Sequence, residues 1–356
     1  MIHALFLAAL LPAAPVAPAH AAIEARLRSG QVALAESELR TIVARAPRDA
    51  AAGTLLAIAL ARQGRTADAS GALQAALENA GPAARLQARG IGRRLESADV
   101  LLQLARLDAQ ANDPRGATES LHHALELAPD SEDVLSAYAQ LMLGLRSYLK
   151  ALQVLDPLTR MCPADAHYHY LLGVALLQAG DMPRAIEFLQ KAERLEPGRA
   201  LTLVALGIAL NEQKRYDEAL PLIQRALERE PQNIEALAVL ATAEEGLGDL
   251  AQAEAHIDRV LAAVPGHHTA NLVKGLIQMK QAHYPEARVA LEKAVAANPT
   301  SKAAHYQLSL AYARLGEETL SQKHLELYRK ALRDIEERIV QIRREAGAAP
   351  AEGMGP

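Results

Sequence analysis

The chain of 356 residues carries a formal net charge of −4, is 50% hydrophobic and 22% charged, and contains one cysteine. These values exclude a disordered or collagen-like chain and leave enough apolar residues for a large buried core. Aromatic residues make up only 3% of the chain. The core must therefore be built from alanine and leucine, which favours closely packed helices over a sheet.

The first 21 residues contain no lysine, arginine, aspartate or glutamate. They hold a short apolar run at 4–11, three prolines and the small residues 19–21. This pattern predicts a secretory signal peptide over residues 1–21, cleaved after Ala21, and therefore a periplasmic or secreted protein. The run is far shorter than the roughly 20 residues of a membrane span, so we expect no stable span. Because this segment lacks positive side chains, a cytoplasmic location is the alternative.

The next feature along the chain is a period of 34 residues. Prolines mark it at Pro129, Pro163, Pro197, Pro231, Pro265 and Pro299. Frames aligned on these prolines start at 98, 132, 166, 200, 234, 268 and 302, which predicts seven repeats over 98–335. Residues 22–82 are predicted to hold further N-terminal repeats, of which the first, at 29–47, is degenerate.

Each frame predicts two helices. The first ends at a glycine in several copies (Gly180, Gly248 and Gly316), where glycine takes the left-handed conformation at low cost. The proline at the end of the frame stops the second helix. Small residues at the eighth and twentieth places, such as Gly173 and Ala185, are expected to let the two helices approach closely.

This pattern resembles the tetratricopeptide repeat (TPR) family. The matching residues in frame 166–199 are Leu172, Gly173, Leu176, Ala185, Leu189, Ala192 and Pro197, whereas His169 stands where the family has an aromatic residue. The resemblance implies an all-α, right-handed superhelical solenoid of about eight to nine helix-turn-helix repeats. In this family the concave face, lined by the first helices, binds other proteins.

Three segments depart from the repeat. An arginine-rich insertion at 83–97 interrupts the array or lengthens one helix, and it is expected to be an irregular loop, with a functional joint as the alternative. At the other end, Leu332, Ile335, Ile339 and Ile342 share one helical face. They predict a C-terminal capping helix, assigned to 336–346, that covers the open end of the stack. The tail at 347–356 is predicted to be disordered.

The places 2, 5, 9 and 12 of a frame form one stripe on the first helix. We predict that this stripe makes an apolar groove for a hydrophobic or amphipathic segment of a partner protein. The predicted groove residues are Tyr170, Val174, Leu177, Val204, Ile208, Asn211, Leu272, Leu276, Met279, Tyr306 and Leu310. Two alternatives are that neighbouring repeats bury these side chains, and that a second copy of the chain covers them in a homo-oligomer.

No motif predicts catalysis, a metal site or a cofactor. The chain lacks a phosphate-binding glycine loop, an HExxH motif and a CxxC motif. Nucleic acid is not an expected partner, because no basic stripe with interleaved aromatics is present. The sequence therefore predicts a non-enzymatic scaffold, with roles such as assembly of a bacterial envelope or export complex suggested by exported TPR proteins. The alternative is a cytoplasmic adaptor or regulatory subunit of an enzyme.

Overall fold

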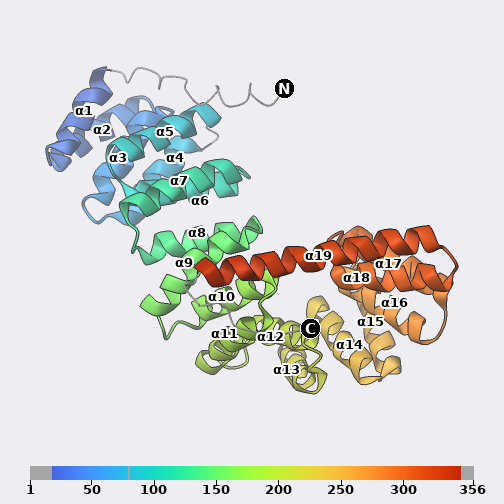
Figure 1. Ribbon diagram of the computed structural model, residues 1–356. Coiled ribbons are helices and arrows are strands. Elements are labelled where there is room, and N and C mark those ends of the chain that lie inside the picture. Colours follow the sequence, from blue (N-terminus) through green and yellow to red (C-terminus); the bar gives the residue numbers. More distant parts are fainter. Residues whose placement is uncertain (1–17, 79–80, 346–356) are drawn as a thin grey trace. The chain divides into compact units, whose positions relative to one another are not determined.

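The structure is a computed structural model that describes residues 18–78 and 81–345. The described residues form nineteen helices, which confirms the predicted all-α fold (Figure 1). Among them, no helix combines the length and apolarity needed to cross a membrane. The chain divides into two compact units, one that ends at Ser147 and one that begins at Tyr148. This boundary falls inside the predicted frame 132–165.

Unit 1 consists of helices that pack on their neighbours along the chain. They are α1 (Pro18–Arg28), α2 (Val32–Arg45), α3 (Ala50–Ala61), α4 (Thr66–Leu77), α5 (Pro82–Arg94), α6 (Ala98–Gln110), α7 (Pro114–Leu127) and α8 (Glu132–Gly144). The predicted cleavage position after Ala21 lies within α1. Residues 1–17 of the predicted signal peptide and the predicted tail at 347–356 lie outside the described residues.

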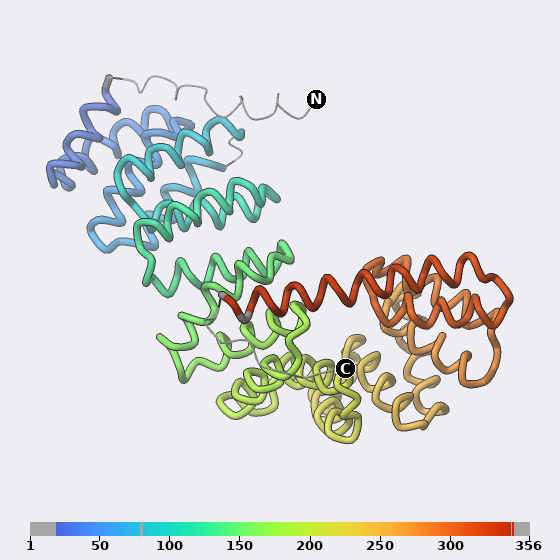
Figure 2. The backbone as a smooth tube through the Cα atoms, viewed as in Figure 1, coloured from blue at the N-terminus to red at the C-terminus, as the bar shows by residue number. Residues whose placement is uncertain are grey.

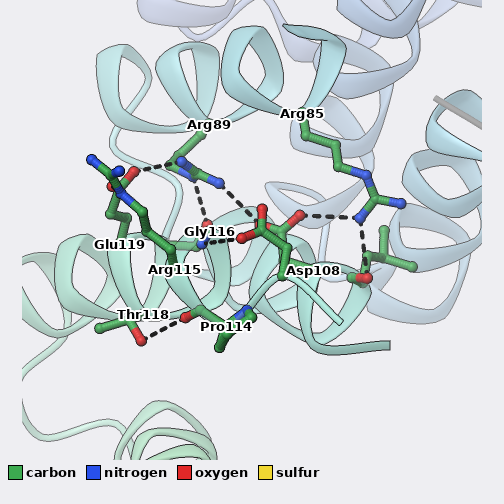
Figure 3. A network of polar contacts seen from close by, with 11 residues as sticks. Arg85, Arg89, Asp108, Pro114, Arg115, Gly116, Thr118 and Glu119 are labelled. Carbon is green, nitrogen blue, oxygen red and sulfur yellow. Dashed lines mark hydrogen bonds and ion pairs between the residues drawn. The ribbon is translucent and has the colours of Figure 1, made fainter. Parts of the chain in front are cut away.

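The arginine-rich insertion is the helix α5, not an irregular loop. Its arginines bind acidic side chains of the neighbouring helices (Figure 3). The Asp108 carboxylate is fully buried and accepts hydrogen bonds from Arg85 Nη1 and Arg89 Nη2, each at 3.1 Å. Arg89 also donates to Glu119 Oε2 at 2.6 Å and to Ser120 Oγ at 2.9 Å. Because a buried carboxylate requires charged partners, these arginines hold α5 against α6 and α7.

Unit 2 contains the more regular repeats. Its helices are α9 (Tyr148–Met161), α10 (Ala166–Ala179), α11 (Met182–Leu195), α12 (Ala200–Glu212), α13 (Tyr216–Arg229), α14 (Ile234–Leu247), α15 (Leu250–Ala263), α16 (His268–Lys280), α17 (Tyr284–Ala297), α18 (Lys302–Arg314) and α19 (Glu318–Glu345). From α10 onward, each first helix pairs with the second helix that follows it. The helix pairs therefore begin at the starts of the predicted frames.

A left-handed residue ends the first helix at the fifteenth place of every frame. Glycine occupies this place at Gly180, Gly248 and Gly316, with φ of 96°, 90° and 77°, as predicted. The other four frames adopt the same conformation without glycine, at Asn112, Arg146, Lys214 and Ala282. A side chain in this region costs roughly 1–2 kcal/mol. The turn is therefore imposed by the packing of the two helices as well as by the local residue.

The glycine at the eighth place faces the large residue at the twenty-fourth place. A Cβ built on Gly173 would lie 2.6 Å from Leu189 Cγ, and one on Gly275 would lie 2.5 Å from Leu291 Cγ. Both leucines are fully buried. The missing side chain thus creates the space that the leucine of the second helix fills.

The C-terminal end differs from the prediction. No separate capping helix follows the last repeat, because α19 is one continuous helix from Glu318 to Glu345. Neither glycine nor proline interrupts this segment, so nothing in its backbone ends the helix near residue 331. Figure 2 shows that α19 pairs with α18 and then runs back to α10, with which it is also in contact.

Candidate functional site

The first helices of unit 2 form the inner side of a curved array. α10, α12, α14, α16 and α18 each contact the next first helix, and each second helix between them packs against the two first helices beside it. Helices on the inside of a curve approach one another more closely than helices on the outside, so the contacts between successive first helices place these helices on the inside. The ribbon of unit 2 shows this curvature from α10 through α14 to α18 (Figure 1).

The predicted groove residues lie on these first helices but differ in exposure. Tyr306 and Leu310 are exposed, at 39% and 37%. Six are half-buried: Tyr170, Val174, Ile208, Leu272, Leu276 and Met279. Leu177, Val204 and Asn211 are buried, at 8%, 6% and 8%. The surface that a partner can reach is therefore smaller than the predicted set.

Asn211 shows how the stacking of the repeats buries one of the predicted groove residues. Its Nδ2 donates a hydrogen bond of 2.9 Å to the carbonyl oxygen of Val239, which ties α12 to α14. The side chains of Leu177 and Val204 are buried between helices in the same way as core residues. These three residues thus stabilise the stacking of the repeats and present little surface to a partner.

Two of the three predicted groove residues on α16 pack against the core of the neighbouring helices. Leu272 and Met279 pack against a buried cluster formed by Ala287, Leu291 and residues of α18. This is the packing by neighbouring repeats that the sequence left open as an alternative. Substitution of Leu272 or Met279 would therefore disturb the core as well as the inner face.

The apolar stripe is interrupted at α14, a helix that the sequence analysis left out of the stripe. The same places carry Glu235, Ala238, Thr242 and Glu245 in this frame. The Glu245 carboxylate is largely buried and forms an ion pair of 2.7 Å with Lys280 Nζ. Lys280 Nζ also donates to the Glu245 carbonyl oxygen at 2.8 Å. The same places of the frame, 2, 5, 9 and 12, identify this polar break in the sequence.

Tyr170 lies at the α10 end of the face, beside Arg199 and His167. The Arg199 guanidinium lies 5.3 Å from the centre of its ring, and the His167 ring stacks on it at 6.5 Å. Burial raises the pKa of the Tyr170 hydroxyl. The phenol therefore stays neutral near pH 7 and offers a ring face and a hydrogen-bonding group.

At the other end of the face, α18 contacts α19 through aromatic side chains. The rings of Tyr306 and Tyr328 lie 5.1 Å apart. His305 Nδ1 and His324 Nδ1 are 3.0 Å apart, and Tyr312 donates a hydrogen bond of 2.7 Å to Glu292 Oε1. Burial and this hydrogen bond raise the pKa of Tyr312 to about 12. Tyr306, predicted to face a partner, is therefore partly covered by the chain's own C-terminal helix.

The far half of α19 contacts the end of α10. A Cβ built on Gly180 would lie 2.7 Å from Ile335 Cγ2, so the isoleucine sits directly against the glycine. Arg338 Nη1 donates to the carbonyl oxygen of Gln178 at 3.2 Å. The helical periodicity of residues 332–342 predicts a capping face for Ile335 but gives no sign of this contact.

No group of three or more histidine, cysteine, aspartate or glutamate side chains within residues 18–78 and 81–345 is arranged to hold a metal ion. The side chains described above offer a partner apolar contact, ring stacking and a few charged groups. These are means of binding a polypeptide segment.

Comparison with known families agrees with this architecture. One sequence profile of the tetratricopeptide repeat matches residues 20–84, 139–200 and 272–334, and a second profile of the same repeat matches residues 210–276. The chain belongs to the tetratricopeptide repeat family. Members of this family are generally non-catalytic and bind other proteins or peptides.

Solved structures share the TPR fold at low identity. A tetratricopeptide repeat protein from Parabacteroides merdae is 19% identical, with a TM-score of 0.50 over 72% of this chain and 95% of that chain. The type IV pilus biogenesis factor PilW is 21% identical, with a TM-score of 0.47 over 60% of this chain and 97% of that chain. YrrB, described as a TPR protein with an unusual peptide-binding site, is 20% identical, with a TM-score of 0.43 over 51% and 94%. No curated protein matches the chain.

Proposed function

We propose that this TPR protein is a non-enzymatic scaffold that binds an apolar or amphipathic segment of a partner protein on the inner face of unit 2. The observation that carries the proposal is the solvent-accessible apolar surface at equivalent places of three first helices. Val174 on α10 and Ile208 on α12 are half-buried, and Leu310 on α18 is 37% exposed. Apolar side chains aligned on an inner face are the usual contacts for a bound segment.

The polar break at α14 refines the kind of partner. The accessible apolar side chains form two groups, one on α10 and α12 and the other on α16 and α18. Between them lie Glu235 and Thr242, both of which retain accessible surface. A partner segment that spans the face would therefore place polar or basic residues between two apolar anchors.

A pull-down with the full chain tests this surface. The test variant is Ile208→Asp with Leu310→Asp, which places two charges on the inner face. The matched control is Val289→Asp, because Val289 is 45% exposed on the second helix α17. Partner capture should be lost in the test variant and kept in the control, while circular dichroism shows equal helix content. Equal capture by both variants would contradict the proposal and assign the inner stripe to packing.

We also propose that the chain is exported and acts in the assembly of an envelope or export complex. The support is the apolar, proline-bounded pattern of residues 1–21. A cytoplasmic adaptor or regulatory subunit of an enzyme is the second candidate, because the segment lacks positive side chains. Mass spectrometry of the N-terminal peptide of the native protein separates the two. A mature chain that starts at Ala22 supports export, and an intact N-terminus contradicts it.

A further inference from the structure

The last turns of α19 extend beyond the repeat to which the helix belongs. The first part of α19 acts as the second helix of the last repeat, since His324 and Tyr328 contact α18. The helix then continues to Glu345. It contains 28 residues, whereas α11, α13, α15 and α17, the second helices of the preceding repeats, contain 14 each. In this extension, Ile335 and Arg338 contact the end of α10, 160 residues away in the sequence for the Arg338 bond.

The extension is amphipathic, and its apolar face is the covered one. Leu332, Ile335 and Ile339 are half-buried and Ile342 is only 4% exposed. On the opposite side Val340 is 46% exposed, and the charged residues at 333, 334, 336 and 337 are exposed. A helix with this pattern loses apolar contacts when its support is removed, and a short unsupported helix is marginal in water.

The end of α10 is shaped to receive such a helix. Gly180 has no side chain and so allows the Ile335 methyl group to reach the backbone of the turn. The Gln178 carbonyl oxygen belongs to the last turn of α10, where carbonyl groups lack partners within the helix. A cation placed there is favoured by the partial negative charge of the helix end, and Arg338 occupies this position.

We propose that the glycine-terminated end of α10 is a binding site for an amphipathic helix, which residues 332–342 of α19 occupy within the same chain and which a partner helix of similar pattern displaces. The pattern is an isoleucine for the Gly180 notch followed three residues later by an arginine for the Gln178 carbonyl. This inference rests on the proposed function, which supplies the partner, and adds a competitor built into the chain.

The size of the contact makes the displacement feasible. The extension contacts α10 through Ile335 and Arg338, and Leu332, Ile335 and Ile339 on its apolar face keep part of their surface accessible. Its advantage over a partner comes from tethering, since a linked segment acts at an effective concentration on the order of millimolar. A free helix with the same contacts should therefore compete poorly with the tethered segment, and a partner that displaces it must bind the site more tightly.

A peptide of residues 328–345, labelled with a fluorophore, tests the site by fluorescence anisotropy against full-length chains. The released chain is Ile335→Asp with Ile339→Asp, and the matched control is Val340→Asp on the exposed side of the same helix. The peptide should bind the released chain at least about tenfold more tightly than the wild type, because the tethered competitor is absent. A peptide carrying Ile335→Asp should lose this binding, and the control chain should behave as the wild type.

Equal peptide binding by the wild type and the released chain would overturn the inference, as would an equal effect of Val340→Asp. Hydrogen exchange of residues 332–345 provides a second measurement that does not depend on the variants. In the wild type these amides should exchange more slowly than in the free peptide, and equal rates would show that the docked state is absent. A wild-type dimer that becomes monomeric in the released chain would overturn the intramolecular assignment in favour of a second copy.

Failure of this inference is distinguishable from failure of the proposed function. The peptide reports on Gly180 and Gln178 at the end of α10, whereas the pull-down reports on Ile208 and Leu310. Loss of peptide binding with normal partner capture would remove the competitor and leave the scaffold proposal standing. Normal peptide binding, together with partner capture that is unchanged by Ile208→Asp and Leu310→Asp, would contradict the scaffold proposal and leave the α10 site standing.

Discussion

Replacement of Asp108 by alanine is expected to destabilise unit 1, because the arginines of α5 would lose the buried carboxylate that they share. The Asp108 side chain is fully buried, and Arg89 is only 7% exposed. Both Asp108 oxygens accept guanidinium hydrogen bonds of 3.1 Å. The variant would leave Arg89 with Glu119 and Ser120 as its remaining partners.

The expected magnitude follows from the burial of these groups. Breaking a buried ion pair costs about 3–5 kcal/mol, since the remaining charge stays buried without compensation. Arg89 keeps an ion pair of 2.6 Å with Glu119, whose side chain is 43% exposed. The lower end of the range therefore applies, and we expect a loss of about 3 kcal/mol. Asp99→Ala on the same helix is the control, because Asp99 is exposed.

Hydrogen exchange under mild denaturant is the appropriate assay, because a repeat array need not unfold in one step. Peptides from α5, α6 and α7 should lose protection in Asp108→Ala and keep it in Asp99→Ala. The double variant Arg89→Met with Asp108→Leu should be more stable than Asp108→Ala, since it removes both charges. A loss below about 1 kcal/mol in Asp108→Ala would refute the reasoning, because that is the effect of an average substitution.

Three further predictions concern unit 2. Gly275→Ala should cost about 1–3 kcal/mol in denaturant unfolding, because its Cβ would lie 2.5 Å from Leu291 Cγ, and an unchanged midpoint would contradict this packing. Ala282→Gly should add about 0.5–1 kcal/mol, because Ala282 has a φ of 61°, and a loss of stability would show that the turn is not strained. Burial and the charge of His305 lower the pKa of His324 in the folded chain. Its contribution to stability is therefore present above the unfolded pKa of about 6.5 and is lost as pH falls below it. His324→Leu should flatten this dependence when unfolding is followed at about pH 7.5 and 5.5, and an unchanged slope would contradict the assignment.

The repeat could be predicted because its signals are local. Pro197 ends one helix pair, and Gly180 or Gly248 ends a first helix, through the conformations that their own backbones prefer. The same turn occurs at Ala282 and Lys214, where the residue gives no such signal. There the regular spacing of 34 residues, and not the residue itself, indicates the turn.

The candidate site was less predictable, because a position on a helix face does not specify what covers it. Val174 and Asn211 both belong to the predicted stripe, at the ninth and twelfth places of their frames, yet one keeps accessible surface and the other bonds to Val239 of the next repeat. Asn211 could not be assigned from periodicity, because its partner lies 28 residues away in a different helix. The polar places of α14 were present in the sequence and were overlooked.

The sequence alone therefore established the family of folds and the helix pairs of the regular repeats. Each of these depends on interactions within one repeat or between adjacent repeats, which recur with the period. Tertiary structure was required to show that α5 is a helix clamped by Asp108 and that α19 returns to Gly180. The first contact involves a helix outside the frames and the second joins two different frames, and both depend on individual side chains that the periodicity of the sequence does not record.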